Sequence, residues 1–452
     1  MHAASLAMGA RSDDPGRVST TRLRAGLVAV AVAASAPPAG AASALAAIAP
    51  EIARGLGPVP AHSVVVVSPL VSDVPAPRGD ELVVRLGSLI AGQVGAEAHA
   101  RPEPFSVAQA LAAKGGALIY VQAEIARGQL RASTDLYPVM SNGWDRIRLP
   151  PAAPRTHAFA SAPLDAEVRG YLPPITLDHS HVQKARHDYG DVLAVSCGDV
   201  DGDGVNDILL VTRTTIAWGR LASGRFVATH AAAWSALAPR LPVSFREPLA
   251  TSAIVPRADG TGSDLLAGTT DRGGVSLSRD LRGAAPLHGL PFLAGGVAAC
   301  VRPSAAASAL EGTLVDCADP GHTLAVAPAT HFDALSIAEL VGKGGASHLL
   351  VAVREPSGAL RLRAGDKDEK LGSAGAQLAV GDLDEDGVAE VATTAESGAD
   401  GITIASWRGD ELVPRVRIPA PTGVRALAVC PPEDAGPSAV VAVVAGEVWV
   451  VR

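Results

Sequence analysis

One acidic pattern occurs twice in the chain, and it constrains the fold more than any other feature. Residues 197–211 read CGDVDGDGVNDILLV, and residues 380–394 read VGDLDEDGVAEVATT. In both copies three acids alternate with other residues, a glycine follows, and a further acid comes before or within an apolar run. Carboxylates beside a buried strand are costly unless a cation neutralises them. The pattern therefore predicts two cation-binding loops, each between two strands.

Calcium fits this pattern, because it takes roughly six to eight oxygen ligands and accepts carboxylates at alternate loop positions. The predicted ligands are Asp199, Asp201, Asp203, the Val205 carbonyl and Asp207 in the first copy, and Asp382, Asp384, Asp386, the Val388 carbonyl and Glu390 in the second. An EF-hand is not predicted, since the twelfth position holds Leu210 or Thr393 and the flanking residues favour strands. An acidic hairpin without metal is the alternative.

Weaker copies of the same unit lie between and after the two acidic loops. They keep the apolar run or the strand–loop–strand shape but lack most of the acids, at residues 257–269, 300–317, 341–353 and 430–444. Units that repeat roughly every 40–50 residues, each with several short strands, are typical of β-propeller blades. The sequence thus predicts a mainly β chain whose residues 171–452 form a β-propeller of about six blades, with seven as the alternative.

The two acidic copies resemble the FG-GAP, or VCBS-type, repeat of integrin-like propellers and of many secreted bacterial proteins. The resemblance covers residues from about 190 onward. It implies a propeller with structural Ca²⁺ in the loops between strands, usually serving adhesion or ligand binding. The other four units lack the acids, so the resemblance implies no metal there.

The start of the chain has the pattern of a secretory signal. Arg22 and Arg24 precede an apolar run at residues 25–34, and small-residue cleavage sites follow. A cut after Ala44 is favoured over one after Ala36, because Pro37 follows the earlier site. Residues 1–44 are therefore predicted to be a signal peptide and leader, with an alanine-rich tail as the alternative. The apolar run is too short to span a bilayer, so the mature chain is predicted to be extracytoplasmic (periplasmic, cell-surface or secreted) without a transmembrane segment.

Residues 45–148 are predicted to form a small α/β domain. A run of valines at 64–67 indicates a buried strand, apolar residues at helical spacing follow at 82–90, and two further strands close the segment. This order is similar to the N-terminal domain of TolB-like periplasmic proteins. Residues 149–170 are rich in proline and alanine and are predicted to be a linker.

The four cysteines lie in the repeat region. Cys300 and Cys317 bracket one loop, so they are predicted to form a disulfide within one blade. Cys197 ends the first inner strand of the ring and Cys430 ends the corresponding strand of the last unit, so ring closure would bring them together. The last unit supplies only three strands, and residues 171–182 are predicted to add the fourth.

Composition narrows the functions that remain. The net charge of −8 and the lack of a basic patch argue against nucleic acid as a partner. The chain contains no GxSxG, HExxH or phosphate-binding loop, so no enzyme is predicted. We expect a non-catalytic, calcium-stabilised scaffold that binds a protein or a glycan at the cell envelope. The alternatives are a TolB-like periplasmic component and a propeller enzyme, either a lyase or a hydrolase; the oligomeric state stays open.

Overall fold

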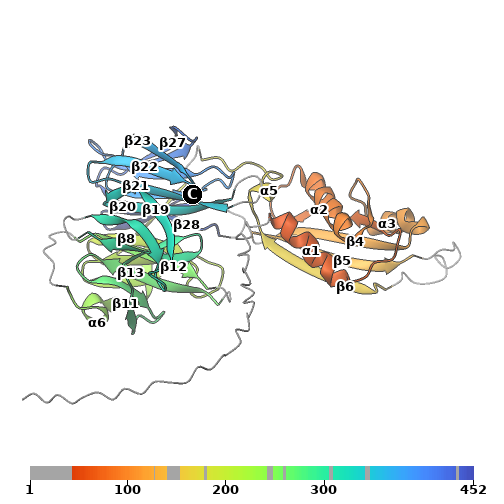
Figure 1. The fold of residues 1–452 in the computed structure, drawn as a ribbon, viewed down its shortest axis with the longest axis horizontal. Coiled ribbons are helices and arrows are strands. Elements are labelled where there is room, and N and C mark those ends of the chain that lie inside the picture. The colour runs from red at the N-terminus through yellow and green to blue at the C-terminus, as the bar shows by residue number, and fades with distance from the viewer. Residues whose placement is uncertain are drawn as a thin grey trace, which may run out of the picture. The chain divides into compact units, whose positions relative to one another are not determined.

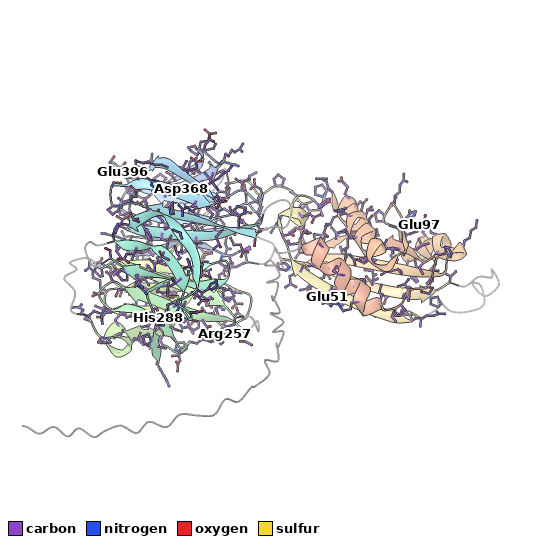
Figure 2. All side chains as sticks on the ribbon, in the orientation of Figure 1. Glu51, Glu97, Arg257, His288, Asp368 and Glu396 are labelled. Atoms are coloured by element: carbon purple, nitrogen blue, oxygen red, sulfur yellow. A yellow bond between two sulfur atoms is a disulfide. The ribbon has the colours of Figure 1, made fainter. Side chains whose placement is uncertain are left out.

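The structure is a computed structural model that describes residues 43–126, 128–139, 153–177, 181–241, 248–257, 261–304, 309–341, 347–433 and 437–452. The chain is mainly β, as predicted: an α/β part comes first and a larger, all-strand ring follows (Figure 1). Charged side chains such as Glu51 and Glu97 in the first part, and Asp368 and Glu396 in the second, are exposed (Figure 2).

The α/β part is built from one sheet and the helices that cover it. Its strands run in the order β3-β1-β4-β5-β6, and β2 also pairs with β4. Its elements are α1 (Ala44–Leu56), β1 (Val64–Val67), β2 (Val71–Ser72), α2 (Gly79–Val94), β3 (Glu97–Ala98), α3 (Phe105–Leu111), a 3₁₀ turn (Ala112–Lys114), β4 (Ala117–Ala126), β5 (Gln129–Pro138), β6 (Thr156–Pro163) and α5 (Ala166–Arg169).

The core of the α/β part follows from the helical spacing of its apolar residues. Leu82, Leu86 and Ile90 recur at intervals of about one turn on α2, and all three are fully buried. Ile48 and Ile52 of α1 are equally buried and belong to the same apolar cluster. Both helices thus cover the sheet with the faces that the pattern indicates.

The predicted linker is wrong from residue 156 onward. There β6 pairs antiparallel with β5, from Leu136 opposite Thr156 to Gln129 opposite Pro163. The alanines at even positions from 158 to 162 are buried and the residues between them are exposed, which is the period-two pattern of a strand. Because alanine is so small and prolines flank the segment, this alternation is easily read as low-complexity sequence. Residues 149–152 lie outside the described residues.

Within the described chain the ring comprises four four-stranded sheets and one eight-stranded sheet that contains the first and last groups, so the strands can be divided into six groups of four. In chain order their bounds are β8 Val192–Gly198, β9 Asp207–Thr212, β10 Thr215–Ala222 and β11 Arg225–Ala233; β12 Ala250–Pro256, β13 Ser263–Thr269, β14 Gly273–Leu277 and β15 Ala284–Pro286; β16 Leu290–Ala294, β17 Val297–Pro303, β18 Leu310–Asp316 and β19 Thr323–Phe332; β20 Ala334–Val341, β21 Ser347–Arg354, β22 Ala359–Ala364 and β23 Lys367–Ser373; β24 Leu378–Gly381, β25 Glu390–Thr394, β26 Gly401–Trp407 and β27 Leu412–Pro419; β28 Val424–Cys430, β29 Ala439–Val444 and β30 Glu447–Val451, with β7 Val182–Arg186. A short helix, α6 (Trp234–Leu237), follows β11.

The groups are arranged as a propeller. The first strand of each group contacts the first strand of the next, in the order β8, β12, β16, β20, β24, β28, and β28 contacts β8 again. Apolar side chains, mostly Val, Leu, Ile and Ala, fill the space between neighbouring groups. The low aromatic content is therefore no obstacle to packing, because the gaps between sheets are filled by many small side chains.

Ring closure uses a strand from the other end of the repeat region. β7 pairs antiparallel with β30, from Val182 opposite Val451 to Arg186 opposite Glu447, and His181 and Arg452 extend the ladder by two hydrogen bonds. The exchange of a strand was predicted for residues 171–182, but the strand lies at 182–186. The two prolines at 173 and 174 cannot donate to a ladder, and pairing begins only where the predicted segment ends.

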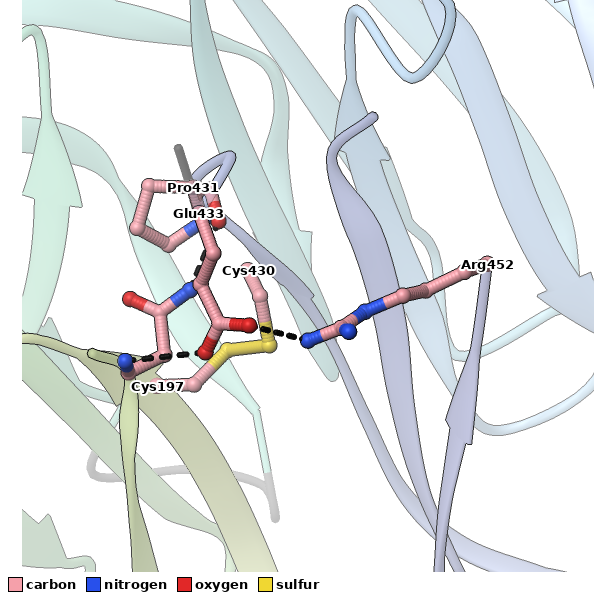
Figure 3. Close-up of a disulfide and its surroundings, with 6 residues drawn as sticks. Cys197, Cys430, Pro431, Glu433 and Arg452 are labelled. Carbon is pink, nitrogen blue, oxygen red and sulfur yellow. Dashed lines mark hydrogen bonds and ion pairs between the residues drawn. A yellow bond between two sulfur atoms is a disulfide. The ribbon is translucent and has the colours of Figure 1, made fainter. Parts of the chain in front are cut away.

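Two disulfides reinforce the ring, and both predicted pairings are confirmed. Cys197 of β8 bonds Cys430 of β28 with a Cα–Cα distance of 5.2 Å, which ties the first group to the last. Beside it, the Glu433 carboxylate accepts hydrogen bonds from Arg452 and from the Asn206 backbone (Figure 3). Cys300 bonds Cys317 across the β17–β18 pair, with 4.9 Å between the Cα atoms.

We expect the two disulfides to stabilise the ring unequally. The Cys197–Cys430 bond closes a loop of 233 residues and the Cys300–Cys317 bond one of 17 residues. In the chain-entropy model this difference amounts to about 2 kcal/mol in favour of the longer loop. Chemical unfolding of the Cys197→Ser/Cys430→Ser variant should therefore show a larger loss than the matched Cys300→Ser/Cys317→Ser variant. Equal losses, or a larger loss for the second pair, would contradict this view of closure.

Candidate metal centres

The two acidic patterns form the connections between the first and second strands of their groups. Residues 199–207, the first loop, join β8 to β9, and residues 382–390, the second loop, join β24 to β25. The last acid of each loop is already the first residue of the following strand: Asp207 is 0% exposed and Glu390 is 1% exposed. The flanking elements are strands, as predicted, and not the helices of an EF-hand.

In both loops the first aspartate accepts hydrogen bonds from the third acid and from the glycine that follows it. Asp199 accepts from the backbone N–H groups of Gly202, Asp203 and Gly204, at 2.6–3.1 Å. Asp382 accepts from Asp386 and Gly387 at 3.0 and 2.9 Å. The glycine after the third acid has a φ of +86° in the first loop and +83° in the second, a conformation that other residues adopt only with strain.

The last acid holds the start of each loop in the same way. Asp207 Oδ2 accepts from Val200 N at 3.0 Å, and Glu390 Oε2 accepts from Leu383 N at 2.8 Å. The side chain of the last acid therefore reaches back under the loop towards the other carboxylates. Local chemistry, rather than packing against the rest of the ring, explains why two copies with different sequences fold alike.

The structure brings together three carboxylates in each loop. Possible ligand oxygens lie within 4.8 Å of one another for Asp199, Asp201 and Asp207 in the first loop, and for Asp382, Asp384 and Glu390 in the second. The third acids, Asp203 and Asp386, fall outside these sets and accept hydrogen bonds from the backbone N–H two residues on. Coordination by these two residues and by the Val205 and Val388 carbonyls stays a prediction.

The first loop contains a cation of its own. Arg220 of β10 donates from Nε to Asp207 Oδ1 at 2.8 Å, from Nη1 to Asp203 Oδ2 at 2.7 Å and from Nη2 to Asp201 Oδ1 at 3.0 Å. The hydrogen bond from Arg220 lowers the pKa of Asp203. The burial of Asp207 raises its pKa, and the contact with Arg220 opposes that rise.

Arg220 was missed by sequence reasoning because it lies outside the repeated pattern. It follows Gly219, which pairs with Ile208, so it stands opposite Asp207 on the neighbouring strand. Aligning the third strand of each unit, residues 215–222 with residues 401–407, is the sequence comparison that could have found it.

The second loop has a serine at the corresponding place. Ser406 of β26 is the residue paired with Glu390, and its hydroxyl donates to Glu390 Oε1 at 2.9 Å. Arg415 of β27 donates to the Ser406 hydroxyl at 3.3 Å. Among the described residues, no ion pair within 4.0 Å reaches Asp382, Asp384 or Glu390.

Carboxylates of the second loop are consequently hard to ionise without a bound cation. Burial, helped by the neighbouring carboxylates, raises the pKa of Asp382 to about 7, that of Asp384 to about 6 and that of Glu390 to about 8. Asp384 is 8% exposed, and its Oδ1 has no hydrogen-bond partner. An orphaned, buried oxygen among converging carboxylates fits a cation that binds oxygen.

The donor set favours a hard divalent cation. All the side-chain donors are carboxylates, and neither loop contains histidine or cysteine, which zinc and copper prefer. The second loop therefore fits Ca²⁺ well. The first loop fits it less well, because a guanidinium already contacts three of its carboxylates.

Comparisons with known proteins add little. No family model and no curated protein matches the chain, so the resemblances to FG-GAP repeats and to TolB-like proteins stay predictions. Among solved structures, the chain is similar to BBS1N in complex with ARL6DN (12% identity over 72% of this chain and 88% of that one, TM-score 0.34). It is also similar to the WD40 domain of Toxoplasma gondii coronin (11%, 72% and 75%, TM-score 0.33) and to AofleA from Arthrobotrys oligospora (9%, 60% and 86%, TM-score 0.35). With TM-scores below 0.5, these likenesses carry no argument about this chain.

We expect the stability of the metal-free protein to fall as the pH rises. The acids of the second loop have higher pKa values in the folded protein than in the unfolded chain, where they return to about 4. The folded protein then binds more protons than the unfolded chain between about pH 4 and pH 8, so its free energy of unfolding decreases over that range. Bound Ca²⁺ reverses this effect, because it stabilises the ionised carboxylates.

Thermal unfolding at several pH values, with chelator and with excess Ca²⁺, tests this expectation. The increase in melting temperature on adding Ca²⁺ should be larger at pH 8 than at pH 5. An increase that is the same at both pH values would contradict it. The Asp384→Asn variant is the control: it removes one of the three carboxylates, so Ca²⁺ should raise its melting temperature less than that of the natural chain.

Proposed function

We propose that the chain is an exported, calcium-stabilised, six-bladed β-propeller that acts as a non-catalytic scaffold for a protein or a glycan at the cell envelope. The single observation that carries the calcium part is the second loop, where three buried carboxylates converge and Asp384 Oδ1 has no partner. The scaffold part is supported by the ring itself, which is locked by a strand exchange and two disulfides and holds its exposed loops in fixed places.

Calcium would act here as part of the fold. A cation that binds the folded loop but not the unfolded chain shifts the equilibrium towards the folded state by mass action. Loops of extracellular modules often bind calcium at roughly 10⁻⁴ to 10⁻³ M. Such an affinity suits a compartment outside the cytoplasm, where the ion is abundant.

Export is supported by the cysteines. All four are paired, and disulfides persist in oxidising compartments. The favoured cleavage site needs revision, however. Ser43 caps α1 by accepting from Ala46 N, and Ala44 is buried and donates from its backbone to Asp165. A cut after Ala44 would remove both contacts, so we place the cut before Ser43.

Mass spectrometry of the protein recovered from the extracytoplasmic fraction tests export and the position of the cut. We expect a mature N-terminus at or before Ser43, because the helix cap is then kept. A chain that retains Met1, or that is found only in the cytoplasm with reduced cysteines, would contradict export. A mature N-terminus at Leu45 would restore the original expectation.

A propeller enzyme is the alternative that one feature favours. The first strands of the groups line a cavity of about 480 Å³, with Asp191, Arg213 and Asp333 among its lining residues. The Asp333 carboxylate is paired with Arg354, and the described lining includes no histidine. The groups available to catalysis are thus few, which is why a binding role is preferred.

Within the described residues, no helix is both long and apolar enough to cross a membrane.

The proposed function is tested by capture of a partner from the envelope fraction. Full-length protein is immobilised and incubated with envelope proteins or with glycans, in Ca²⁺ or in chelator. We expect retention of a defined partner in Ca²⁺ and weaker retention in chelator or with the Asp384→Ala variant. The control is Asp366→Ala, which changes an exposed acid outside both loops.

Four results would count against the proposal. A melting temperature unaffected by chelation would contradict stabilisation of the fold by calcium. Failure to retain any envelope protein or glycan would remove the binding role. Glycan cleavage in place of retention would favour the propeller enzyme. A partner from a TolB-type envelope complex would favour the periplasmic component, because TolB-like proteins also have an α/β domain before a ring.

A further inference from the structure

We propose that Arg220 takes the place of a metal ion in the first loop, so that the protein binds one calcium ion, in its second loop, and that the residue facing the last acid decides which loop binds metal. This inference rests on the proposed calcium binding and goes beyond it. The repeated acids predict two equivalent sites, whereas the side chains opposite them make the sites different.

Arg220 contacts two of the three converging acids that a metal would use, Asp201 and Asp207. Its Nε donates to Asp207, its Nη1 to Asp203 and its Nη2 to both Asp201 and Asp203, at 2.7–3.0 Å. Arginine keeps its charge at every physiological pH. Because this cation is attached to the chain, it offsets part of the charge of the acids at any calcium concentration.

Ser406 cannot do the same in the second loop. Its hydroxyl makes one hydrogen bond to Glu390 and brings no charge. Arg415 donates to that hydroxyl at 3.3 Å and, within the described part of the chain, makes no ion pair within 4.0 Å with the loop carboxylates. The second loop therefore needs an ion from solution.

The two positions are equivalent by strand register, which makes the comparison fair. Glu390 is paired with Ser406 on β26, and Asp207 stands opposite Arg220 on β10, one step beyond the Ile208–Gly219 pair. The two loops also share the backbone hydrogen bonds to the last acid and from the glycine after the third acid to the first aspartate. The loops differ at further positions, such as Gly202 against Glu385, but the residue facing the last acid is the one that contacts the carboxylates from the neighbouring strand.

Counting bound ions tests the inference directly. Full-length protein is freed of metal and equilibrated with Ca²⁺, and bound calcium is measured by equilibrium dialysis and by native mass spectrometry. We expect one ion for the natural chain and two for Arg220→Ser. Arg225→Ser is the matched control: it removes an exposed arginine that pairs with Asp188, outside both loops, and it should leave one ion.

A second set of variants locates the single ion. Asp384→Asn should abolish calcium binding, whereas Asp201→Asn should leave it unchanged. Ser406→Arg places a guanidinium opposite Glu390 and should abolish binding, while Ser406→Ala, which adds no charge, should keep it. Ser406 is buried, so circular dichroism must show that the arginine variant is folded; if it is not, the count for Arg220→Ser decides alone.

The outcomes separate this inference from the proposed function. Two ions on the natural chain, or one ion on both the natural chain and Arg220→Ser, would overturn the role of Arg220 and leave calcium binding intact. No ion on the natural chain would overturn both. If Arg220→Ser folds only in Ca²⁺, with two ions bound, the first loop has become dependent on metal, as the inference requires.

Discussion

The structure depends on the antiparallel ladder between β7 and β30. Without a fourth strand the last group would end at β30, and the outer edge of this strand would expose unpaired backbone groups. The last group receives its fourth strand from residues 182–186, which precede the first group. The Cys197–Cys430 bond lies at the same seam and joins the innermost strands, while the ladder joins the outer ones. The seam is therefore held covalently inside and by backbone hydrogen bonds outside.

The acidic loops solve a problem that comes with this architecture. Each loop begins at the end of an inner strand and finishes with a carboxylate at the start of a buried strand, so the charge cannot be left in water. An arginine on the adjacent strand offsets part of the charge of the first loop, and the second loop has only a serine there. The two loops thus differ in the positive charge that the chain itself places beside their carboxylates.

Much of the fold and of the two acidic loops could be predicted from local sequence, because the hydrogen bonds and the apolar spacing that shape them involve residues close together in the chain. The loop geometry follows from Asp, Gly and backbone N–H groups within one short segment, and helix α2 follows from the spacing of Leu82, Leu86 and Ile90. Both disulfides were predictable once the repeat was recognised. The repeated pattern also indicated a mainly β ring.

The features that the sequence did not reveal have a common cause: each of them depends on pairing between strands. β6 was hidden because its buried face consists of alanines that signal no strand by themselves. The closing strand was displaced because register, and not composition, decides where pairing begins. Arg220 was overlooked because the carboxylates that it contacts lie in the preceding loop and strand and not beside it in the sequence.

The strand exchange also determines how late in synthesis the ring can close. β30 ends at Val451, while its partner β7 begins at Val182. Residues 182–451 must therefore all leave the ribosome, and cross a membrane if the protein is exported, before the ring can close. Contacts between segments so far apart in sequence form slowly, because the entropy of the long intervening chain is lost first. Until β30 is made, β7 lacks its antiparallel partner, and an unpaired strand edge of this kind favours aggregation.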